Sequence, residues 1–172
     1  MNIRRLRADD AAAFQALRLA ALLDTPEAFA SSHDEEKDLP LDAVARRFED
    51  RPGHAVFGAF HGDALVGVVG LAREARAKMA HKAHVWGMYV GGAARGHGVA
   101  RQLMEAVLAL ARETAGIAKL TLSVDAANVA AIALYESLGF VVFGREADAM
   151  RIGADIRNDL QMSLHLAPPA TP

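Results

Sequence analysis

Residues 85–101 are the segment that most limits how this chain can fold. They read VWGMYVGGAARGHGVAR, an apolar strand followed by a glycine-rich turn. After the turn, apolar residues recur at intervals of three and four, as on the core-facing side of a helix. Glycines let the backbone approach a ligand closely, and the unpaired N–H groups at a helix start attract negative charge. The segment therefore predicts a strand, a loop and a helix with an anion site at the loop.

Two common phosphate-binding loops do not fit this segment. A Walker-type loop ends in Gly-Lys-Ser/Thr, and no lysine lies between Lys82 and Lys119. A dinucleotide fingerprint needs a third glycine, and residues 96–101 (GHGVAR) lack it. Glycines alone are equally compatible with a purely structural turn. The pattern thus excludes two ligand classes without naming a third.

The rest of the chain mixes hairpin-linked strands with strand–helix–strand units. We expect helices at 11–23, 41–48, 99–116 and 128–138, a short helical piece at 26–31, and strands at 2–7, 54–60, 64–71, 83–90, 120–124, 140–143 and 159–166. This order predicts an α/β fold, of the mixed α+β kind, with helices flanking the sheet. It is not the order of a doubly wound dinucleotide-binding fold.

Length and composition set the class of protein. The chain has 172 residues, 52% of them hydrophobic, so we expect a single domain over residues 1–166. Because three of the last six residues are proline, we expect a flexible tail over 167–172.

A net charge of −2 lacks the basic excess of nucleic-acid-binding proteins, so we expect no nucleic-acid partner. No apolar run reaches the ~18 residues of a membrane span and the charged N-terminus does not suit a secretory signal, so we expect no membrane association and a cytoplasmic protein. The absence of cysteine excludes disulfides and thiolate zinc sites, and we predict no metal cofactor.

Two segments together carry the most specific signal in the sequence. Arg95-Gly96-His97-Gly98-Val99-Ala100 fits the pattern Q/R-x-x-G-x-G/A and follows the apolar strand Met88-Tyr89-Val90. Downstream, residues 128–140 fit N-x-x-A-x-x-L-Y-x-x-x-G-F. These two blocks, at this separation and with this element order, resemble the GCN5-related N-acetyltransferases (GNAT). The resemblance implies a mostly antiparallel twisted sheet in which one parallel strand pair splays apart at the acyl-CoA site.

The resemblance also implies a reaction and a set of site residues. Acetyl-CoA would be the co-substrate, and its acetyl group would pass by direct attack in a ternary complex to a primary amine of a small molecule or peptide. The backbone of the strand would hold the acetyl carbonyl and pantetheine, and loop N–H groups would bind the pyrophosphate. The implied cofactor-binding residues are Met88, Tyr89, Val90, Arg95, Gly96, His97, Gly98, Val99, Ala100, Arg101 and Asn128.

Tyr135 would protonate the departing thiolate, but several of these residues also have ordinary structural explanations. Tyr135 suits a half-buried packing position on its helix, and Asn128 suits an N-cap. His97 is expected to face solvent. We favour a catalytic Tyr135 because the rest of the block surrounds it.

The general base is the part of the reaction that the sequence does not identify. An amine with a pKa of ~10.4 is neutral at pH 7 in only about one molecule in 2,500, so a proton must be removed. Many family members use a glutamate on the strand before the loop, and residues 83–89 contain none. We rank first a water relay through Ser123 and Asp125, which share one face of a strand, and second His84. The catalytic candidates are therefore Tyr135, His84 and Asp125.

The acceptor pocket is expected to come from the first helices and the loop after Arg73. The acidic run Asp34-Glu35-Glu36-Lys37-Asp38 is expected to be a solvated linker rather than a surface that attracts an amine. Residues 26–29 (PEAF) resemble a segment of small-molecule acetyltransferases of unassigned substrate. Two other functions stay open: a non-catalytic acyl-CoA-binding module, and a transferase for other acyl groups or an oxygen acceptor. The oligomeric state also stays open, with a homodimer among the alternatives.

Overall fold

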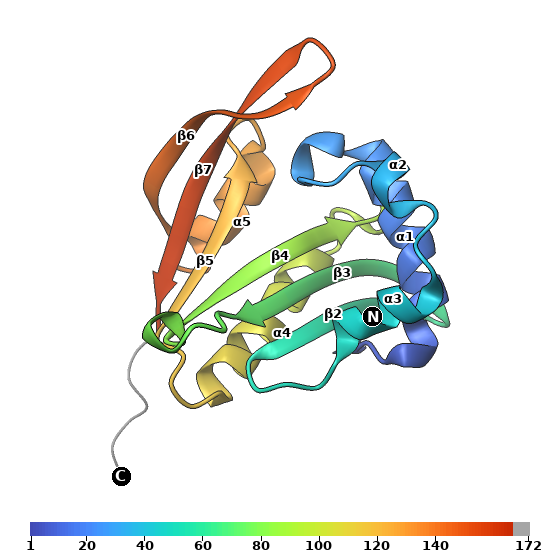
Figure 1. Cartoon of the computed structure of the whole chain (residues 1–172), viewed down its shortest axis with the longest axis horizontal. Coiled ribbons are helices and arrows are strands. Elements are labelled where there is room, and N and C mark those ends of the chain that lie inside the picture. Colours follow the sequence, from blue (N-terminus) through green and yellow to red (C-terminus); the bar gives the residue numbers. More distant parts are fainter. Residues whose placement is uncertain (167–172) are drawn as a thin grey trace.

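A seven-stranded mixed sheet runs through the centre of the computed structural model, which describes residues 1–166 (Figure 1). The expected tail at 167–172 lies outside the described residues. The strands are β1 (Asn2–Arg5), β2 (His54–His61), β3 (Ala64–Arg73), β4 (Lys82–Val90), β5 (Lys119–Asp125), β6 (Val141–Ile152) and β7 (Asp155–His165). Their order is β1-β2-β3-β4-β5-β7-β6, and every neighbouring pair is antiparallel except β4 and β5. The prediction of a mixed, mostly antiparallel sheet is confirmed.

Helices cover both faces of this sheet. They are α1 (Ala11–Asp24), α2 (His33–Glu36), α3 (Leu41–Ala45), α4 (Val99–Glu113) and α5 (Val129–Ser137), with short 3₁₀ turns η1 (Ala8–Asp10), η2 (Pro26–Ala28), η3 (Arg46–Phe48), η4 (Ala77–Met79) and η5 (Gly92–Ala94). Figure 1 shows α4 crossing behind the strands. None of the helices in residues 1–166 is long and apolar enough to cross a membrane.

Alternation along the central strands explains the two-faced core. On β2, Ala55, Phe57 and Ala59 pack in the cluster that holds the buried side of α4, whereas Val56 and Phe60 pack in the cluster that holds α1. Successive side chains of a strand point to opposite faces, so one apolar run supplies both layers. The glycine-rich loop and the cavity beside it are therefore mounted on a sheet that is packed from both sides.

The segment predicted to be a solvated linker is instead a packed helix. Ser32 and Glu35 cap α2 reciprocally, each side chain bonding the backbone N–H of the other. Glu36 is buried and paired with Arg18 of α1 at 2.8 Å, and Arg47 of η3 donates to its other oxygen at 3.1 Å. Burial alone would raise the pKa of Glu36, but hydrogen bonds and charges from Arg18, Ser31 and Arg47 outweigh burial and lower the pKa to about 2. The linker prediction was wrong because Glu36 finds its partner 18 residues away.

The parallel pair at the middle of the sheet is short. β4 and β5 pair only at Lys82↔Lys119, Ala83↔Leu120 and His84↔Thr121, and the strands diverge beyond that point. In β4, Gly87 and Met88 stand opposite the single residue Val69 of β3, and Gly87 has φ +64°, a bulge that bends the strand. The predicted splay of a parallel pair is thus confirmed.

Candidate active site

A cavity of about 770 Å³ lies in the wedge between the diverging ends of β4 and β5. Its walls come from residues 84–90 of β4, 122–125 of β5, the first turns of α5 and the loop at 25–31 that follows α1, with Met150, Arg157 and Asp159 from the β6–β7 hairpin. The size suits a bound small molecule. The loop after Arg73 does not line this cavity, because it joins β3 to the amino end of β4, whereas the strands splay at the carboxyl end. The long β6–β7 hairpin occupies that position instead.

The glycine-rich loop presents a row of backbone donors at one end of the cavity. Gly96 and Gly98 have φ +78° and +73°, values that favour glycine, and Gly98 is the N-cap of α4. The first N–H that α4 itself uses is that of Gln102, which donates to the carbonyl of Gly98 at 3.1 Å. The N–H groups of residues 96–101 make no close, well-aligned hydrogen bond to a backbone carbonyl within residues 1–166. Together with the helix dipole they make this end of the cavity suited to an anion, as the sequence predicts.

Side chains fix this loop to α1. Arg95 donates from Nε to the carbonyl of Val90 at 2.8 Å and from its guanidinium to Asp24 at 2.6 Å. The Tyr89 hydroxyl also donates to Asp24, at 3.0 Å, and these hydrogen bonds lower the pKa of that carboxyl. The side chains of Tyr89 and Arg95 thus hold protein groups. His97 is exposed, with Nδ1 2.8 Å from the carbonyl of Arg95.

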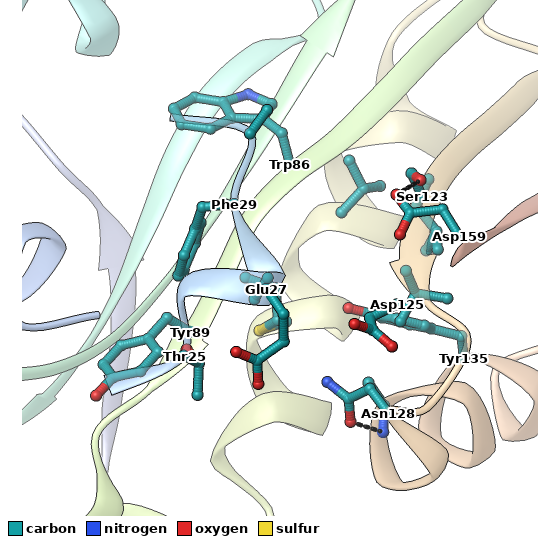
Figure 2. Close-up of a pocket in the computed structure, with 18 of the residues that line it drawn as sticks. Thr25, Glu27, Phe29, Trp86, Tyr89, Ser123, Asp125, Asn128, Tyr135 and Asp159 are labelled. Atoms are coloured by element: carbon teal, nitrogen blue, oxygen red, sulfur yellow. Dashed lines mark hydrogen bonds between the residues drawn. The ribbon is translucent and has the colours of Figure 1, made fainter. Parts of the chain in front are cut away.

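Tyr135 faces the cavity from α5 (Figure 2). Its side chain is 6% exposed and packs near Phe140, with ring centroids 6.0 Å apart. Burial raises the pKa of its hydroxyl to about 12, so the phenol stays protonated at neutral pH. The hydroxyl has no hydrogen-bond partner within the described chain, which leaves its proton for a ligand atom. Asn128 caps α5 by accepting from the N–H of Ala131 at 3.1 Å and also lines the cavity.

The two alternatives for a base differ in their surroundings. Asp125 is buried and accepts from Arg157 at 2.7 Å and from the N–H of Ala127 at 2.7 Å. Ser123 donates instead to Asp159 at 2.7 Å, so Ser123 and Asp125 are not joined in one hydrogen-bonded chain. A relay between them would have to pass through water, and Asp125 stays a prediction as a catalytic residue.

His84 lines the cavity near the point where β4 and β5 separate. Its Nδ1 lies 3.3 Å from the hydroxyl of Thr121, and burial lowers the pKa of the imidazole. A lowered pKa keeps the ring neutral at pH 7, as a proton acceptor must be. His84 and Tyr135 both stay predictions as catalytic residues.

No role was predicted from the sequence for Glu27, Arg18, Arg157 or Asp159, all of which line the cavity, although Glu27 lies in the segment 26–29 (PEAF) noted above. The available signal for Glu27 was Pro26, which ends α1 and starts a short turn directly after it. Nothing local in the sequence marks the other three, because the chain brings them in from distant elements.

Comparisons with known proteins agree with this architecture. The model of the Acetyltransferase (GNAT) family matches residues 17–140, more than half of the chain. A search of curated proteins finds no match. Among solved structures, an acetyltransferase of the GNAT family from Streptococcus pneumoniae is similar with a TM-score of 0.88 and 21% identity, over 96% of this chain and 99% of that one.

Two further structures show the same fold. One is yncA, a putative acetyltransferase from Salmonella typhimurium solved with its cofactor acetyl-CoA, with a TM-score of 0.81 and 22% identity over 100% of this chain and 97% of that one. The other is a ribosomal-protein-alanine N-acetyltransferase from Brucella melitensis, with a TM-score of 0.79 and 24% identity over 96% of this chain and 100% of that one. The structural matches establish the fold and the family match establishes the relationship: this chain belongs to the GNAT family of acetyltransferases.

Proposed function

We propose that this protein is an acetyl-CoA-dependent N-acetyltransferase that acts on a primary amine in a ternary complex. The observation that carries the proposal is the row of backbone N–H groups at residues 96–101, which make no close, well-aligned hydrogen bond to a backbone carbonyl within the described residues and reach the cavity wall at Ala100. A pyrophosphate supplies the negative charge that such a row binds. The yncA structure, solved with acetyl-CoA on the same fold, supports this choice of ligand.

Different residues along the cavity bind different parts of acetyl-CoA in this proposal. In the proposed complex, N–H groups at 96–101 hold the pyrophosphate, and the backbone of Met88 and Val90 holds the pantetheine arm and acetyl carbonyl in the gap beside β4. Acetyl-CoA supplies an activated acetyl group as a thioester. Binding both substrates in one cavity replaces a bimolecular encounter with an oriented one.

The acceptor nitrogen loses two protons in the proposed reaction. The acceptor loses one proton to become a neutral amine, and His84 or a water molecule takes it. The amine nitrogen forms the new C–N bond as the C–S bond breaks, and Tyr135 gives its hydroxyl proton to the sulfur. The second proton on nitrogen returns to the Tyr135 oxygen, so the net products are the amide, free CoA and one proton released to solvent.

A panel of primary amines tests the proposal. Purified protein is mixed with acetyl-CoA and each amine, and release of the CoA thiol is followed over time. We expect release that needs both substrates, with initial-rate plots that intersect, because direct transfer passes through a ternary complex. Binding of acetyl-CoA without release on any amine would overturn the proposal in favour of a non-catalytic binding module. Release without an acceptor preference for nitrogen over oxygen would also contradict it.

A further inference from the structure

The turn η2 carries Glu27 over the cavity. It follows α1 directly and contacts both β5 and β6, which lie across the splay from β4. Hydrogen bonds from the N–H of Ala28 to the carbonyl of Thr25 at 3.0 Å and from Phe29 to Pro26 at 3.3 Å fix its backbone. Two residues after Glu27, the Phe29 side chain is buried in the core and only 5% exposed. Glu27 is therefore held in place by its neighbours on both sides.

The Glu27 carboxylate has no partner of its own. Figure 2 shows it between Tyr89 on one side and Asp125 and Asn128 on the other. The side chain is half-buried and lines the cavity, yet it makes no hydrogen bond or ion pair with any of residues 1–166. A half-buried carboxylate without a partner leaves both oxygens for a ligand that donates hydrogen bonds.

The other charges on the cavity wall leave the space negative. Each arginine on the wall already has a carboxylate partner: Arg18 with Glu36 at 2.8 Å, Arg95 with Asp24 at 2.6 Å and Arg157 with Asp125 at 2.7 Å. Glu27 and Asp159 are the wall carboxylates without an ion pair in the described chain, and the Asp159 carboxylate accepts one hydrogen bond, from the Ser123 hydroxyl at 2.7 Å. With their ion-pair partners included, four arginines (Arg18, Arg47, Arg95 and Arg157) face five carboxylates (Asp24, Glu27, Glu36, Asp125 and Asp159), and this excess of one negative charge in a concave site favours a cation.

The residues around Glu27 also indicate which kind of substituent the bound cation carries. Trp86 and Phe29 line the same cavity, as do the apolar residues Leu122 and Val124 of β5. Figure 2 shows the Trp86 and Phe29 rings on one side of Glu27. An ammonium bound at the carboxylate would place its carbon substituent against this apolar surface, which favours burial of a hydrophobic group.

We propose that Glu27 selects the acceptor by binding the ammonium group of a primary amine that carries an apolar, aryl or alkyl, substituent. This inference rests on the proposed function, because it names the substrate class of the same cavity. Glu27 acts here as a specificity-determining residue, and proton removal is left to His84 or water. Glu27 therefore contributes to acceptor binding and not to the rate once the acceptor is bound.

The test compares two ligands of the same shape and different charge. Phenethylamine is protonated at pH 7, whereas 2-phenylethanol is neutral and nearly isosteric. Their binding to the protein saturated with CoA is measured by calorimetric titration for the wild type, Glu27→Gln and Glu105→Gln. Glu105 is exposed on α4 outside the cavity, so its variant controls for the same change in net charge.

We expect the wild type and Glu105→Gln to prefer the amine. Glu27→Gln should bind phenethylamine about 10- to 100-fold more weakly, the range for a hydrogen bond to a charged group, with its affinity for 2-phenylethanol unchanged. Because the Glu27 side chain makes no hydrogen bond or ion pair with residues 1–166, the melting temperature should stay close to the wild-type value. Equal binding of the amine by Glu27→Gln and wild type, or no preference for the amine in the wild type, would overturn the inference.

Kinetics separate this inference from the proposed function. With the best aliphatic amine of the panel, Glu27→Gln should raise KM for the amine 10- to 100-fold while kcat and KM for acetyl-CoA stay near the wild-type values. A wild type that binds acetyl-CoA but transfers to no amine refutes the proposed function. A wild type that transfers, with an unaltered Glu27→Gln, refutes only the role of Glu27.

Discussion

Among single residues, Tyr135 gives the clearest test of catalysis, because one hydroxyl can be removed while the ring stays. Tyr135→Phe keeps the packing against Phe140, so the melting temperature should be nearly unchanged. A CoA thiol resembles a cysteine thiol with a pKa of ~8.5, which makes the thiolate a tolerable leaving group, so the gain from an acid lies at the low end of its usual range. Turnover should fall ~10- to 10²-fold with KM for acetyl-CoA almost constant. Unaltered turnover in a folded variant would remove Tyr135 from the mechanism.

The buried Tyr135 hydroxyl also makes stability depend on alkaline pH. Its pKa is about 12 in the folded protein, above the ~10 of an unfolded chain, so the folded state holds this proton more tightly. The stabilisation is complete below pH 10 and is lost as pH rises towards 12, by roughly 3 kcal/mol in all. Urea unfolding between pH 9 and 12 should show a smaller loss in Tyr135→Phe than in the wild type. An equal loss in both would mean that other groups cause the alkaline transition.

Residues of the site were predictable where a local pattern marks them. Asn128, Tyr135 and the loop at 95–101 lie in continuous segments whose spacing is visible in the sequence. The ion pair of Asp125 with Arg157, 32 residues away, and the position of Glu27 on the cavity wall became visible only in the folded structure. Pairings between distant residues leave no periodic signal, so sequence reasoning could not supply them.

At the scale of elements, acetyl-CoA binding at the loop between β4 and α4 should be weakened more by a substitution of Gly98 than by one of Arg95. Gly98→Asp places a side chain and a negative charge where φ is +73° and where the N–H groups meet an anion, so acetyl-CoA affinity should fall at least ~100-fold. Arg95→Ala loosens the loop but leaves its N–H groups, so the loss should be about tenfold or less. Dissociation constants from titration measure both.

The control for this pair is Gly62→Asp. Gly62 has φ +58° in the exposed β2–β3 turn, so the substitution introduces similar backbone strain far from the loop. Its acetyl-CoA affinity should match the wild type. Losses of equal size from Gly98→Asp and Arg95→Ala would indicate a side-chain ion pair with the ligand instead of backbone binding.

The contact between α1, α2 and η3 depends on Glu36. Glu36→Gln leaves the buried Arg18 guanidinium without its counter-charge, and breaking such a pair typically costs about 3 to 5 kcal/mol. The wild type should also lose stability as pH falls from 4.5 towards 2, because the folded-state pKa of Glu36 is lowered to about 2, and the variant should lack this part of the acid transition. Denaturant unfolding at pH 7 and at pH 2 to 5 measures both effects.

Asp34→Asn is the matched control on the same helix. Asp34 is exposed and pairs with Lys37 at 2.7 Å, a surface ion pair that contributes little. Its variant should unfold nearly as the wild type does. If Asp34→Asn and Glu36→Gln were equally stable, the buried cluster would not hold these elements together.

Elements were predicted well where periodicity is strong and poorly where it is weak. The stripe of Val99, Leu103 and Val107 marks α4, and all three are fully buried. β6 and β7 are longer than the expected 140–143 and 159–166, since most of β6 is exposed and its residues 145–148 (READ) show no apolar alternation. β6 is stabilised by backbone pairing with β7, and a pattern of side chains does not report that pairing.

At the scale of the whole molecule, acetyl-CoA should raise the melting temperature, because the proposed ligand site is built from both halves of the sheet. A ligand at 100 times its dissociation constant adds ~2.7 kcal/mol to the folded state, or roughly 5 to 11 °C for a chain of this size. Differential scanning fluorimetry with acetyl-CoA, ATP and NAD measures the shift. An equal or larger shift with ATP would show that the loop binds a different nucleotide.

The short contact between β4 and β5 divides the chain as well as the sheet. β1 to β4 come from residues 2–90 and β5 to β7 from residues 119–165. Three residue pairs between β4 and β5 join these two groups of strands. Proteins open locally in contiguous cooperative units, and a boundary with so few backbone hydrogen bonds is a natural edge for such a unit. In hydrogen-exchange experiments, amide protons of β5 to β7 should therefore exchange as one group, separately from those of β1 to β4. A ligand that bridges the gap would merge the two groups into one.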